Sequence, residues 1–241
     1  MTHSDAMAAG LSLVAGYLIG GVPFGYLIAR ARGVDIRKVA SGNIGATNVG
    51  RALGRRWGLV VLALDVAKGF APVLFLAGAV ACWLSADFVN LVRAATGLGA
   101  ILGHVFTPYL GLKGGKGVAT SIGVFAALLS YWIALPLAAY VLARRLSGFV
   151  SAGSTLLAIL LPVAAYFRCM VDPHLKNPAG AWPVIALAGL ACVLVLVRHS
   201  ANIVRLARGT EHPAGGDRTD TARAQARPAE ERPERRGSET R

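Results

Sequence analysis

Apolar runs long enough to cross a lipid bilayer recur along the chain, and they restrict its fold more than any other feature. A membrane-spanning helix needs about 20 predominantly apolar residues, because each residue adds only ~1.5 Å to its length. Such runs occupy residues 10–31, 57–84, 89–109, 149–167 and 182–197. The composition, 55% hydrophobic and 15% charged, also excludes an ordinary soluble domain. The sequence therefore predicts an all-α integral membrane protein.

The run at 117–143 allows two interpretations, one long tilted helix or two short helices that turn near 130–132. Two helices give seven crossings and place the most basic loops on one side of the membrane. Those loops are 32–56, 108–117, 144–148 and everything after Arg198. Basic loops remain in the cytoplasm. We therefore expect seven transmembrane helices, two of them short (about 117–130 and 131–145), with the N-terminus outside and the C-terminus cytoplasmic.

The predicted membrane domain has a short segment before it and a polar tail after it. Residues 1–9 form an N-terminal extension, and residues 10–207 form a single seven-helix domain. No basic segment precedes the first apolar run, which predicts a transmembrane helix and not a signal peptide. Residues 208–241 contain no Val, Ile, Leu, Met or aromatic residue, and eight arginines alternate with seven acidic residues. Because such a segment cannot bury enough apolar surface to order itself, we expect a disordered cytoplasmic tail.

Acidic residues are scarce in the membrane domain. The five acids before residue 208 are Asp5, Asp35, Asp65, Asp87 and Asp172. A basic, acid-poor body suits an anionic substrate and lacks the carboxylate cluster that magnesium-dependent phosphate chemistry needs. No basic face interleaved with aromatic residues is present, so nucleic acid is not an expected partner. We expect neither a metal nor a cofactor.

The apolar runs contain ionisable residues, among them Asp65, Lys68 and His104. Asp65 and Lys68 are three residues apart, so they share one helix face, and we expect a structural ion pair rather than a catalytic one. His104 lies near the end of a predicted helix, where a role in bracing the following loop is the simplest interpretation.

The loop from Lys113 to Gly117, Lys-Gly-Gly-Lys-Gly, lies between two apolar runs. Glycine tolerates positive φ and close approach, so the N–H groups of Gly114, Gly115 and their neighbours can converge on an anion. A helix that begins near Gly117 adds its partial positive charge, and the ammonium groups of Lys113 and Lys116 suit phosphate oxygens. This loop predicts a phosphate-binding cradle. The alternative is a flexible basic loop that only marks the cytoplasmic side.

Further polar loops lie on the same side of the membrane as this loop in the predicted topology. The first contributes Ser41, Gly42, Asn43, Thr47, Asn48 and Arg51. Another contributes His199, Asn202 and Arg205, whose spacing of three residues projects them from about one face of a helix. The loop at 145–154 adds Ser147, Ser151 and Ser154. Several cations, several neutral donors and one histidine together predict a site for one or two phosphate groups.

Three of these stretches resemble the motifs of the bacterial acyl-phosphate:glycerol-3-phosphate acyltransferases, the PlsY family. They are Ser41-Gly-Asn-Ile-Gly-Ala-Thr-Asn48, Lys113-Gly-Gly-Lys-Gly-Val-Ala-Thr120 and His199-x-x-Asn-Ile-x-Arg-Leu206. The resemblance covers residues 10–211. It implies transfer of an acyl group from acyl phosphate to the 1-hydroxyl of sn-glycerol 3-phosphate, which gives lysophosphatidic acid and phosphate and begins phospholipid biosynthesis.

The resemblance also implies a setting for this reaction. It predicts a multi-pass protein of the bacterial plasma (inner) membrane with its active site on the cytoplasmic face. No metal takes part, and neither acyl-CoA nor acyl-carrier protein is the direct donor. The substrates are acyl phosphate and glycerol 3-phosphate, and a phosphate:acyl-carrier-protein acyltransferase would act upstream as a functional partner.

Carried over by position, the resemblance assigns roles to individual residues. Ser41, Gly42, Asn43 and the backbone of 114–117 would form the cradle for the acyl-phosphate head group. Lys116 would lie between the donor and acceptor phosphates, and Arg51 would bind the acceptor. The residues near the acceptor would be His199, Asn202 and Ser151, with Ser154 as the alternative to Ser151. One departure is Thr107-Pro108, where the family usually has Phe-Pro.

Two questions stay open at this stage. The proton of the acceptor hydroxyl can pass to the donor's own phosphate, or His199 can act as the base, and we favour a binding and orienting role for His199. The rival function is a phosphate or organic-anion transporter, since glycine-rich basic loops and short helices suit that class too. Transporters usually contain inverted repeats, and we find none in this sequence.

Overall fold

The computed structural model describes residues 3–76, 78–79, 86–172, 178–211 and 213, and every regular element in these ranges is helical. The long helices are α1 (His3–Gly21), α4 (Arg55–Ala71), α6 (Ala86–Val105), α9 (Val150–Val171) and α10 (Pro178–Arg198). Shorter helices are α2 (Phe24–Ala31), α3 (Ala46–Leu53), α7 (Val118–Leu129), α8 (Ala134–Ser147) and α11 (Ser200–Ala207). Single turns are η1 (Ile36–Lys38), η2 (Pro72–Leu76), η3 (Pro108–Leu110) and η4 (Ser130–Ile133). The all-α prediction is confirmed.

Small residues let the long helices α1 and α6 approach closely. A Cβ atom on Gly16 or Gly20 of α1 would collide with the backbone of Thr96 or Ala100 of α6. Glycine at these positions brings the two backbones into direct contact, as is common between membrane helices. The pairs α4 with α7, α8 with α9, and α10 with both α6 and α9 complete the bundle.

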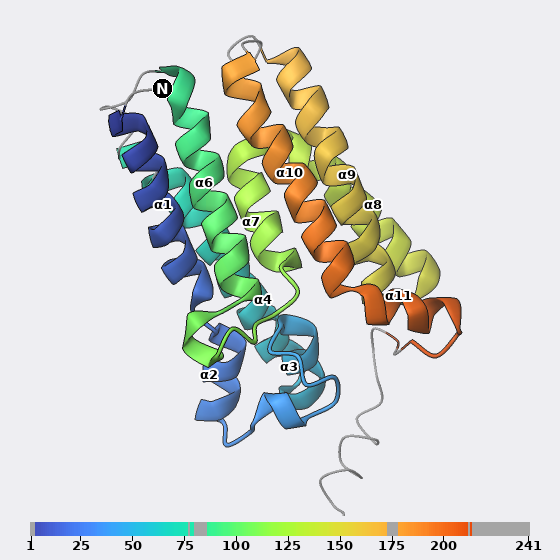
Figure 1. Cartoon of the computed structure of the whole chain (residues 1–241). Helices are drawn as coiled ribbons and strands as arrows, with labels where there is room; N and C mark the ends of the chain where they lie inside the picture. Colours follow the sequence, from blue (N-terminus) through green and yellow to red (C-terminus); the bar gives the residue numbers. More distant parts are fainter. Residues whose placement is uncertain (1–2, 77, 80–85, 173–177, 212, 214–241) are drawn as a thin grey trace, which may run out of the picture.

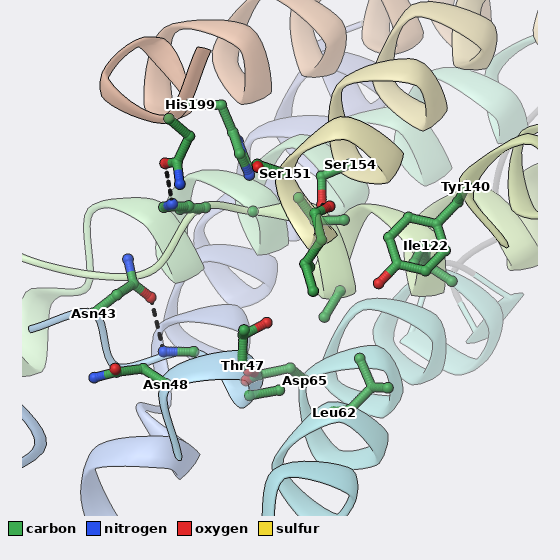
Figure 2. Close-up of a pocket in the computed structure, with 18 of the residues that line it drawn as sticks. Asn43, Thr47, Asn48, Leu62, Asp65, Ile122, Tyr140, Ser151, Ser154 and His199 are labelled. Carbon is green, nitrogen blue, oxygen red and sulfur yellow. Dashed lines mark hydrogen bonds between the residues drawn. The ribbon is translucent and has the colours of Figure 1, made fainter. Parts of the chain in front are cut away.

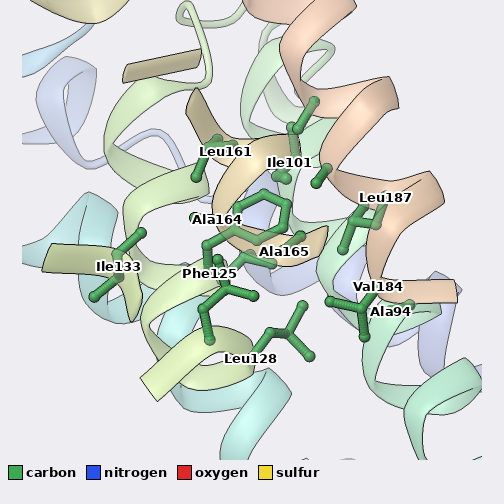
Figure 3. Close-up of a cluster of buried hydrophobic side chains, with 14 of the residues drawn as sticks. Ala94, Ile101, Phe125, Leu128, Ile133, Leu161, Ala164, Ala165, Val184 and Leu187 are labelled. Carbon is green, nitrogen blue, oxygen red and sulfur yellow. The ribbon is translucent and has the colours of Figure 1, made fainter. Parts of the chain in front are cut away.

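A buried hydrophobic cluster holds the second half of the bundle together (Figure 3). Phe125 of α7 is fully buried at its centre, between Ile101 of α6 and Leu161 of α9. Leu187 of α10 closes the cluster on another side. Between membrane helices the close van der Waals packing of such side chains stabilises association, so this cluster fixes α7 against α9 and α10.

The stretch predicted as one long or two short helices is broken at Ser130. This residue has a φ of 52°, and η4 separates α7 from α8. Because α7 has 12 residues and α8 has 14, their lengths are about 18 and 21 Å, less than the ~30 Å of a bilayer core. The turn lies beside the end of α9, where Trp132 and Asp172 line a small pocket. The start of α7 and the middle of α8 instead line a second, separate cavity, which is described below. The chain therefore reverses direction between α7 and α8 (Figure 1).

Six helical segments of the described chain are long and apolar enough to cross a membrane, with 118–147 counted among them as one. All the connecting loops predicted to be basic gather at one end of the bundle, together with α2, α3 and α11, and the N-terminus lies at the other end (Figure 1). The end of the bundle where these loops gather holds the cavity described below.

Several predicted boundaries need correction. The first helix begins at His3, not at residue 10, since Asp5 in its first turn complements the helix dipole and the alanines that follow favour helix. The first span ends at Ala31, as predicted, and Pro23 lies at a break between α1 and α2 within it. The tail predicted to be disordered from 208 begins with residues 208–211 and 213 placed against the cavity. The remainder of the tail and Asp87 lie outside the residues whose side chains are described.

Candidate active site

A cavity of about 370 Å³ lies among the loops at this end (Figure 2). Its polar wall comes from the segment 41–51, Lys116, the start of α9, and the segment 199–211. Its apolar wall comes from the helices, through Leu62, Val66, Ile122, Leu137 and Val141. The cavity therefore combines a polar end at the loops with an apolar end between α4, α7 and α8.

Most of the predicted site residues line this cavity. Those that do are Ser41, Asn43, Thr47, Asn48, Arg51, Lys116, Gly117, Ser151, Ser154, His199, Asn202 and Arg205. Four others predicted to bind substrate are absent from its lining, namely Gly42, Lys113, Gly114 and Gly115. The fold thus brings the three motif loops together, although they are up to about 160 residues apart in sequence.

The glycine loop differs from the predicted cradle. The N–H groups of Gly114 and Gly115 donate to the carbonyls of Val105 and His104, at 3.1 and 3.0 Å, so they are not free for an anion. Arg198 donates to the carbonyls of the same two glycines at 3.4 and 3.2 Å. The loop is therefore fastened to the end of α6 and to the end of α10, and Lys113 is exposed outside the cavity.

Two features of the predicted cradle remain. Gly117 has a φ of 87° and caps the N-terminus of α7, so the first residues of that helix line the cavity. The partial positive charge of a helix N-terminus favours an anion there. The loop thereby supplies Lys116 and a helix end, instead of a nest of glycine N–H groups.

Lys116 extends from this loop to the opposite wall. Its ammonium group donates to Oδ1 of Asn202 on α11. Burial is the main cause that lowers the pKa of Lys116 to about 8; the charge of Glu211 opposes this shift, and the charges of Arg205, Arg51 and Arg198 add to it. The group is thus charged at neutral pH but titrates far closer to neutrality than an ordinary lysine.

His199 lies at the junction of α10 and α11, where it is 3% exposed. Its Nδ1 is 2.9 Å from the carbonyl oxygen of Val195. Because a carbonyl can only accept, Nδ1 carries the proton in this contact, and Nε2 of the neutral ring is an acceptor. Burial, followed by the charge of Lys116, lowers the pKa of His199 to about 4. The imidazole is therefore neutral at pH 7.

The segment 41–51 is held in place by its own asparagines. The buried Asn48 side chain accepts from the Ser41 N–H at 3.2 Å and donates to the carbonyls of Ile36 and Val39 at 3.2 and 3.0 Å. Asn43 accepts from the Gly45 N–H at 2.8 Å, one residue before α3 (Figure 2). Asn48 thus uses its amide to fold the loop, and its role in binding substrate stays a prediction.

Ser151 and Ser154 differ in the direction of their hydroxyl groups. Ser154 donates to the carbonyl of Val150 at 2.9 Å, within its own helix. Ser151 donates to a carboxylate oxygen of Glu211 at 3.1 Å. The predicted preference for Ser151 agrees with this geometry, because its hydroxyl is the one directed at a group across the site.

Sequence reasoning missed Glu211, which was assigned to the tail. Its side chain is 5% exposed, and its carboxylate also accepts from Asn202 at 2.6 Å and from Arg205 at 2.8 Å. Partial burial raises the pKa of Glu211, but the hydrogen bonds from Asn202, Arg205 and Ser151 outweigh it, so the pKa lies below its usual range. No local pattern indicates that this residue returns to the site. Tyr140 of α8, which also lines the cavity, was missed as well.

The predicted intramembrane ion pair is confirmed. Nζ of Lys68 is 2.8 Å from Oδ1 of Asp65, and both side chains are 4% exposed. Lys68 also donates at 2.8 Å to the carbonyl of Val22, at the break between α1 and α2. Nδ1 of His104 is 3.7 Å from the same Asp65 oxygen. The pair thus braces the helices around the cavity, and Asp65 also lines it.

This chain is similar to known proteins over most of its length. A family model for glycerol-3-phosphate acyltransferase matches residues 10–209. The glycerol-3-phosphate acyltransferase of Geobacter sulfurreducens is 42% identical over 196 residues, covering 81% of this chain and 92% of its own. That of Shouchella clausii is 44% identical over 210 residues, covering 85% and 97%.

Two crystal structures of PlsY (YgiH), an integral membrane glycerol 3-phosphate acyltransferase, are similar in fold. The glycerol 3-phosphate form has a TM-score of 0.72 and 37% identity, and the lysophosphatidic acid form has a TM-score of 0.70 and 36% identity. Each match covers 85% of this chain and 94% of the PlsY chain. The predicted resemblance is thereby confirmed: this chain belongs to the glycerol-3-phosphate acyltransferase family of integral membrane acyltransferases.

Proposed function

We propose that the chain transfers an acyl group from acyl phosphate to the 1-hydroxyl of sn-glycerol 3-phosphate. The products are lysophosphatidic acid and inorganic phosphate. The observation that carries this proposal is a single cavity with cations at one end and aliphatic side chains at the other. The relatives of this chain act on glycerol 3-phosphate, and one structural neighbour was solved in a lysophosphatidic acid form.

The cationic end suits two phosphate groups. Lys116 contacts Asn202 of α11, and Arg51 and Arg205 line the same cavity. Arginine presents a fork that matches phosphate oxygens, and lysine supplies a compact charge. We assign the acceptor phosphate to the side of Arg205, Asn202 and Ser151, and the donor phosphate to the side of Ser41 and the α7 N-terminus.

The aliphatic end suits the acyl chain. Leu62 of α4 and Val141 of α8 line the cavity and are also 38% and 45% exposed on the helix surface. In a bilayer these two surfaces face lipid, so the acyl chain of the donor can enter between α4 and α8 without crossing water. The acyl chain then lies along α4, α7 and α8, and the carbonyl carbon of the acyl group lies near Lys116.

The transfer needs no other reactant. The 1-hydroxyl oxygen attacks the acyl carbonyl carbon, a new C–O ester bond forms, and the C–O bond to phosphate breaks. The hydroxyl proton passes to the departing phosphate, which leaves as inorganic phosphate. Positioning two anions and stabilising the charge that develops on the carbonyl and phosphate oxygens is the role of Lys116 and its neighbours. Neutral His199, with Nε2 as an acceptor, orients the hydroxyl.

The same proposal includes the setting of the enzyme. We assign seven crossings, with the N-terminus outside and the cavity at the cytoplasmic face of a bacterial plasma membrane, because the basic loops share one end of the bundle. A phosphate:acyl-carrier-protein acyltransferase would supply the acyl phosphate. The tail beyond 213 would lie in the cytoplasm.

Phosphate release from a synthetic acyl phosphate tests the reaction. The purified protein in lipid should release phosphate only when glycerol 3-phosphate is present, and EDTA should have no effect. Acylation of glycerol 3-phosphate that requires acyl-CoA or acyl-carrier protein instead, with release of the free thiol, would exclude acyl phosphate as the donor. No transfer from any donor, with labelled phosphate crossing sealed vesicles, would establish the transporter.

A further inference from the structure

A tyrosine interrupts the aliphatic wall of the cavity. Among the residues that the structure describes in this lining, Tyr140 of α8 alone carries a phenyl ring. Leu137 and Val141 line the cavity from the same face of α8, three residues before it and one after it. Figure 2 shows the ring reaching from α8 into the cavity. A bulky side chain therefore projects into the space that we assign to the acyl chain.

A glycine on α9 fixes the position of this ring. A Cβ atom on Gly153 would lie 2.8 Å from Cδ2 and 3.1 Å from Cε2 of Tyr140, and 2.7 Å from the carbonyl oxygen of Tyr140. Ring and backbone of Tyr140 thus both fill the space that the missing side chain leaves. Because only two torsions move a tyrosine ring and Gly153 backs this one, the ring is a rigid part of the wall.

The contact with Gly153 also places Tyr140 near the polar end of the cavity. In sequence, Gly153 lies between Ser151 and Ser154, two serines of α9 that line the cavity. A helix rises 1.5 Å per residue, so Gly153 is only about 3 Å along the axis from Ser151. We assign the acceptor phosphate to the side of Ser151. Tyr140 therefore lies beside the acyl carbons nearest to the reacting carbonyl.

The wall restricts the acyl chain less at a greater distance from the carbonyl. Leu62 and Val141 are 38% and 45% exposed on the surface that faces lipid, so the later carbons of the chain lie where the wall opens. A methyl branch at the far end of the chain has bilayer around it. A methyl branch next to the carbonyl instead meets a packed ring, and a packed interior yields little to an added methyl group.

We propose that Tyr140 is a specificity-determining residue that excludes acyl groups branched at C2, the carbon next to the carbonyl. The inference rests on the proposed function, because it takes the position of the acyl chain from it. Tyr140 acts by steric exclusion and takes no part in the bond changes of the transfer. A straight chain passes along the ring, whereas a C2 methyl group forces the ring off Gly153.

Transfer from three synthetic acyl phosphates tests the exclusion. They carry hexadecanoyl, 2-methylhexadecanoyl and 15-methylhexadecanoyl chains, and kcat/KM for each is measured with the full-length protein in lipid at saturating glycerol 3-phosphate. We expect Tyr140→Ala to raise the ratio of the 2-methyl to the straight chain by about tenfold or more over the wild type, the usual effect of one carbon in a pocket. The ratio for the 15-methyl chain should not change. Comparing ratios between proteins removes the effect of the branch on the intrinsic reactivity.

Further variants separate the ring from the hydroxyl and from a general disturbance. Tyr140→Phe keeps the ring, so its ratio should equal that of the wild type. Tyr140→Leu removes the ring but keeps an apolar side chain for packing, and it should change the ratio in the same direction as Tyr140→Ala. The matched control is Tyr131→Ala in the turn before α8, where the tyrosine is 73% exposed and outside the cavity lining. This control should leave the ratio unchanged.

Three results would overturn the inference. The first is an unchanged ratio for the 2-methyl chain in Tyr140→Ala and Tyr140→Leu. The second is an equal rise for the 2-methyl and 15-methyl chains, because the ring would then restrict the whole passage and not C2. The third is a raised ratio in Tyr140→Phe, which would assign the selection to the hydroxyl.

Binding without turnover separates this inference from the proposed function. Acyl phosphonates, in which a methylene group replaces the bridging oxygen of the donor, are measured at equilibrium with straight and 2-methyl chains. The Kd ratio should change in Tyr140→Ala as the kcat/KM ratio does. A protein that binds the phosphonates but transfers no acyl group would refute the proposed function, and the Kd ratio would still decide the role of Tyr140. If neither phosphonate binds to the wild type, both proposals fall.

Discussion

The ammonium group of Lys116 donates to Oδ1 of Asn202, and this contact joins two loops that are 86 residues apart. Lys116 comes from the loop before α7, and Asn202 comes from the first turn of α11. The contact crosses the polar end of the cavity, where Arg51 and Arg205 also lie. A charge held in this way is positioned before substrate arrives, which is what stabilising a transition state requires.

Replacing Lys116 should therefore reduce transfer strongly. We expect Lys116→Ala to lower kcat/KM by about 10²–10³, the usual loss when a preorganised charge or donor is removed from a transition state. Lys113→Ala is the matched control, because Lys113 is exposed and lies outside the cavity lining. Steady-state kinetics of both variants decide the assignment. Equal losses for the two lysines would show that the loop acts only through its overall charge.

The pH dependence of kcat/KM should report the titration of Lys116. Its pKa is about 8, lowered from the ordinary lysine value by burial, so its positive charge is lost as the pH rises through 8. We expect kcat/KM to fall above pH 8 in the wild type, because this parameter follows the free enzyme. The negative charge of Glu211 raises the pKa of Lys116, so the fall should begin at lower pH in Glu211→Gln. A profile flat to pH 10 would contradict this assignment.

His199→Asn separates an orienting role from a base. The pKa of His199 is about 4, so the ring is a weak base at neutral pH, and its Nδ1 is engaged by Val195. We expect the variant to raise KM for glycerol 3-phosphate by about tenfold while kcat falls by less than about threefold, as for a residue that binds ground and transition states alike. A loss confined to kcat would identify His199 as the base instead.

Gly115→Ala should disturb the packing of His104, which lines the cavity. A Cβ on Gly115 would collide with Nε2 of His104, whose ring lies beside Asp65. Since the Gly115 N–H is bonded to the His104 carbonyl, the loop cannot move away without losing that hydrogen bond. We expect a loss of about 1–3 kcal/mol in stability, typical of overpacking, measured by thermal unfolding in detergent. Gly189→Ala is the control, because a Cβ there meets nothing within 4 Å. An unaltered melting temperature for Gly115→Ala would show that this packing relaxes freely.

The number of crossings can be tested with single cysteines. Lys113→Cys and Ser147→Cys introduce thiols at two exposed positions, before α7 and at the end of α8. If α7 and α8 make separate crossings, both positions lie in the cytoplasm, and a membrane-impermeant maleimide labels them only after the cells are lysed. Tyr131→Cys, in the turn between the two helices, should then be labelled in intact cells. Labelling of positions 113 and 147 from opposite sides would establish one crossing for 118–147 and six in total.

Much of the fold follows from the sequence because its determinants are local or periodic. Apolar runs must become helices in a bilayer, since every backbone group there needs an internal hydrogen bond. The break near Ser130 follows from the distribution of charge, because two short helices bring 144–148 to the same end as the other basic loops. The Asp65–Lys68 pair follows from a helical spacing of three, and the motif loops from their residue types.

Tertiary structure alone decided how those loops use their polar groups. The N–H groups of Gly114 and Gly115 bind the end of α6, and the amide of Asn48 folds its own loop, because the approach of distant backbone supplies their partners. Glu211 looks like one acid among many in a polar tail, and only the positions of Ser151, Asn202 and Arg205 turn it into a ligand of the site. Composition and spacing fix which residues can bind an anion. Which of them remain free to do so depends on contacts between segments that the sequence does not place side by side.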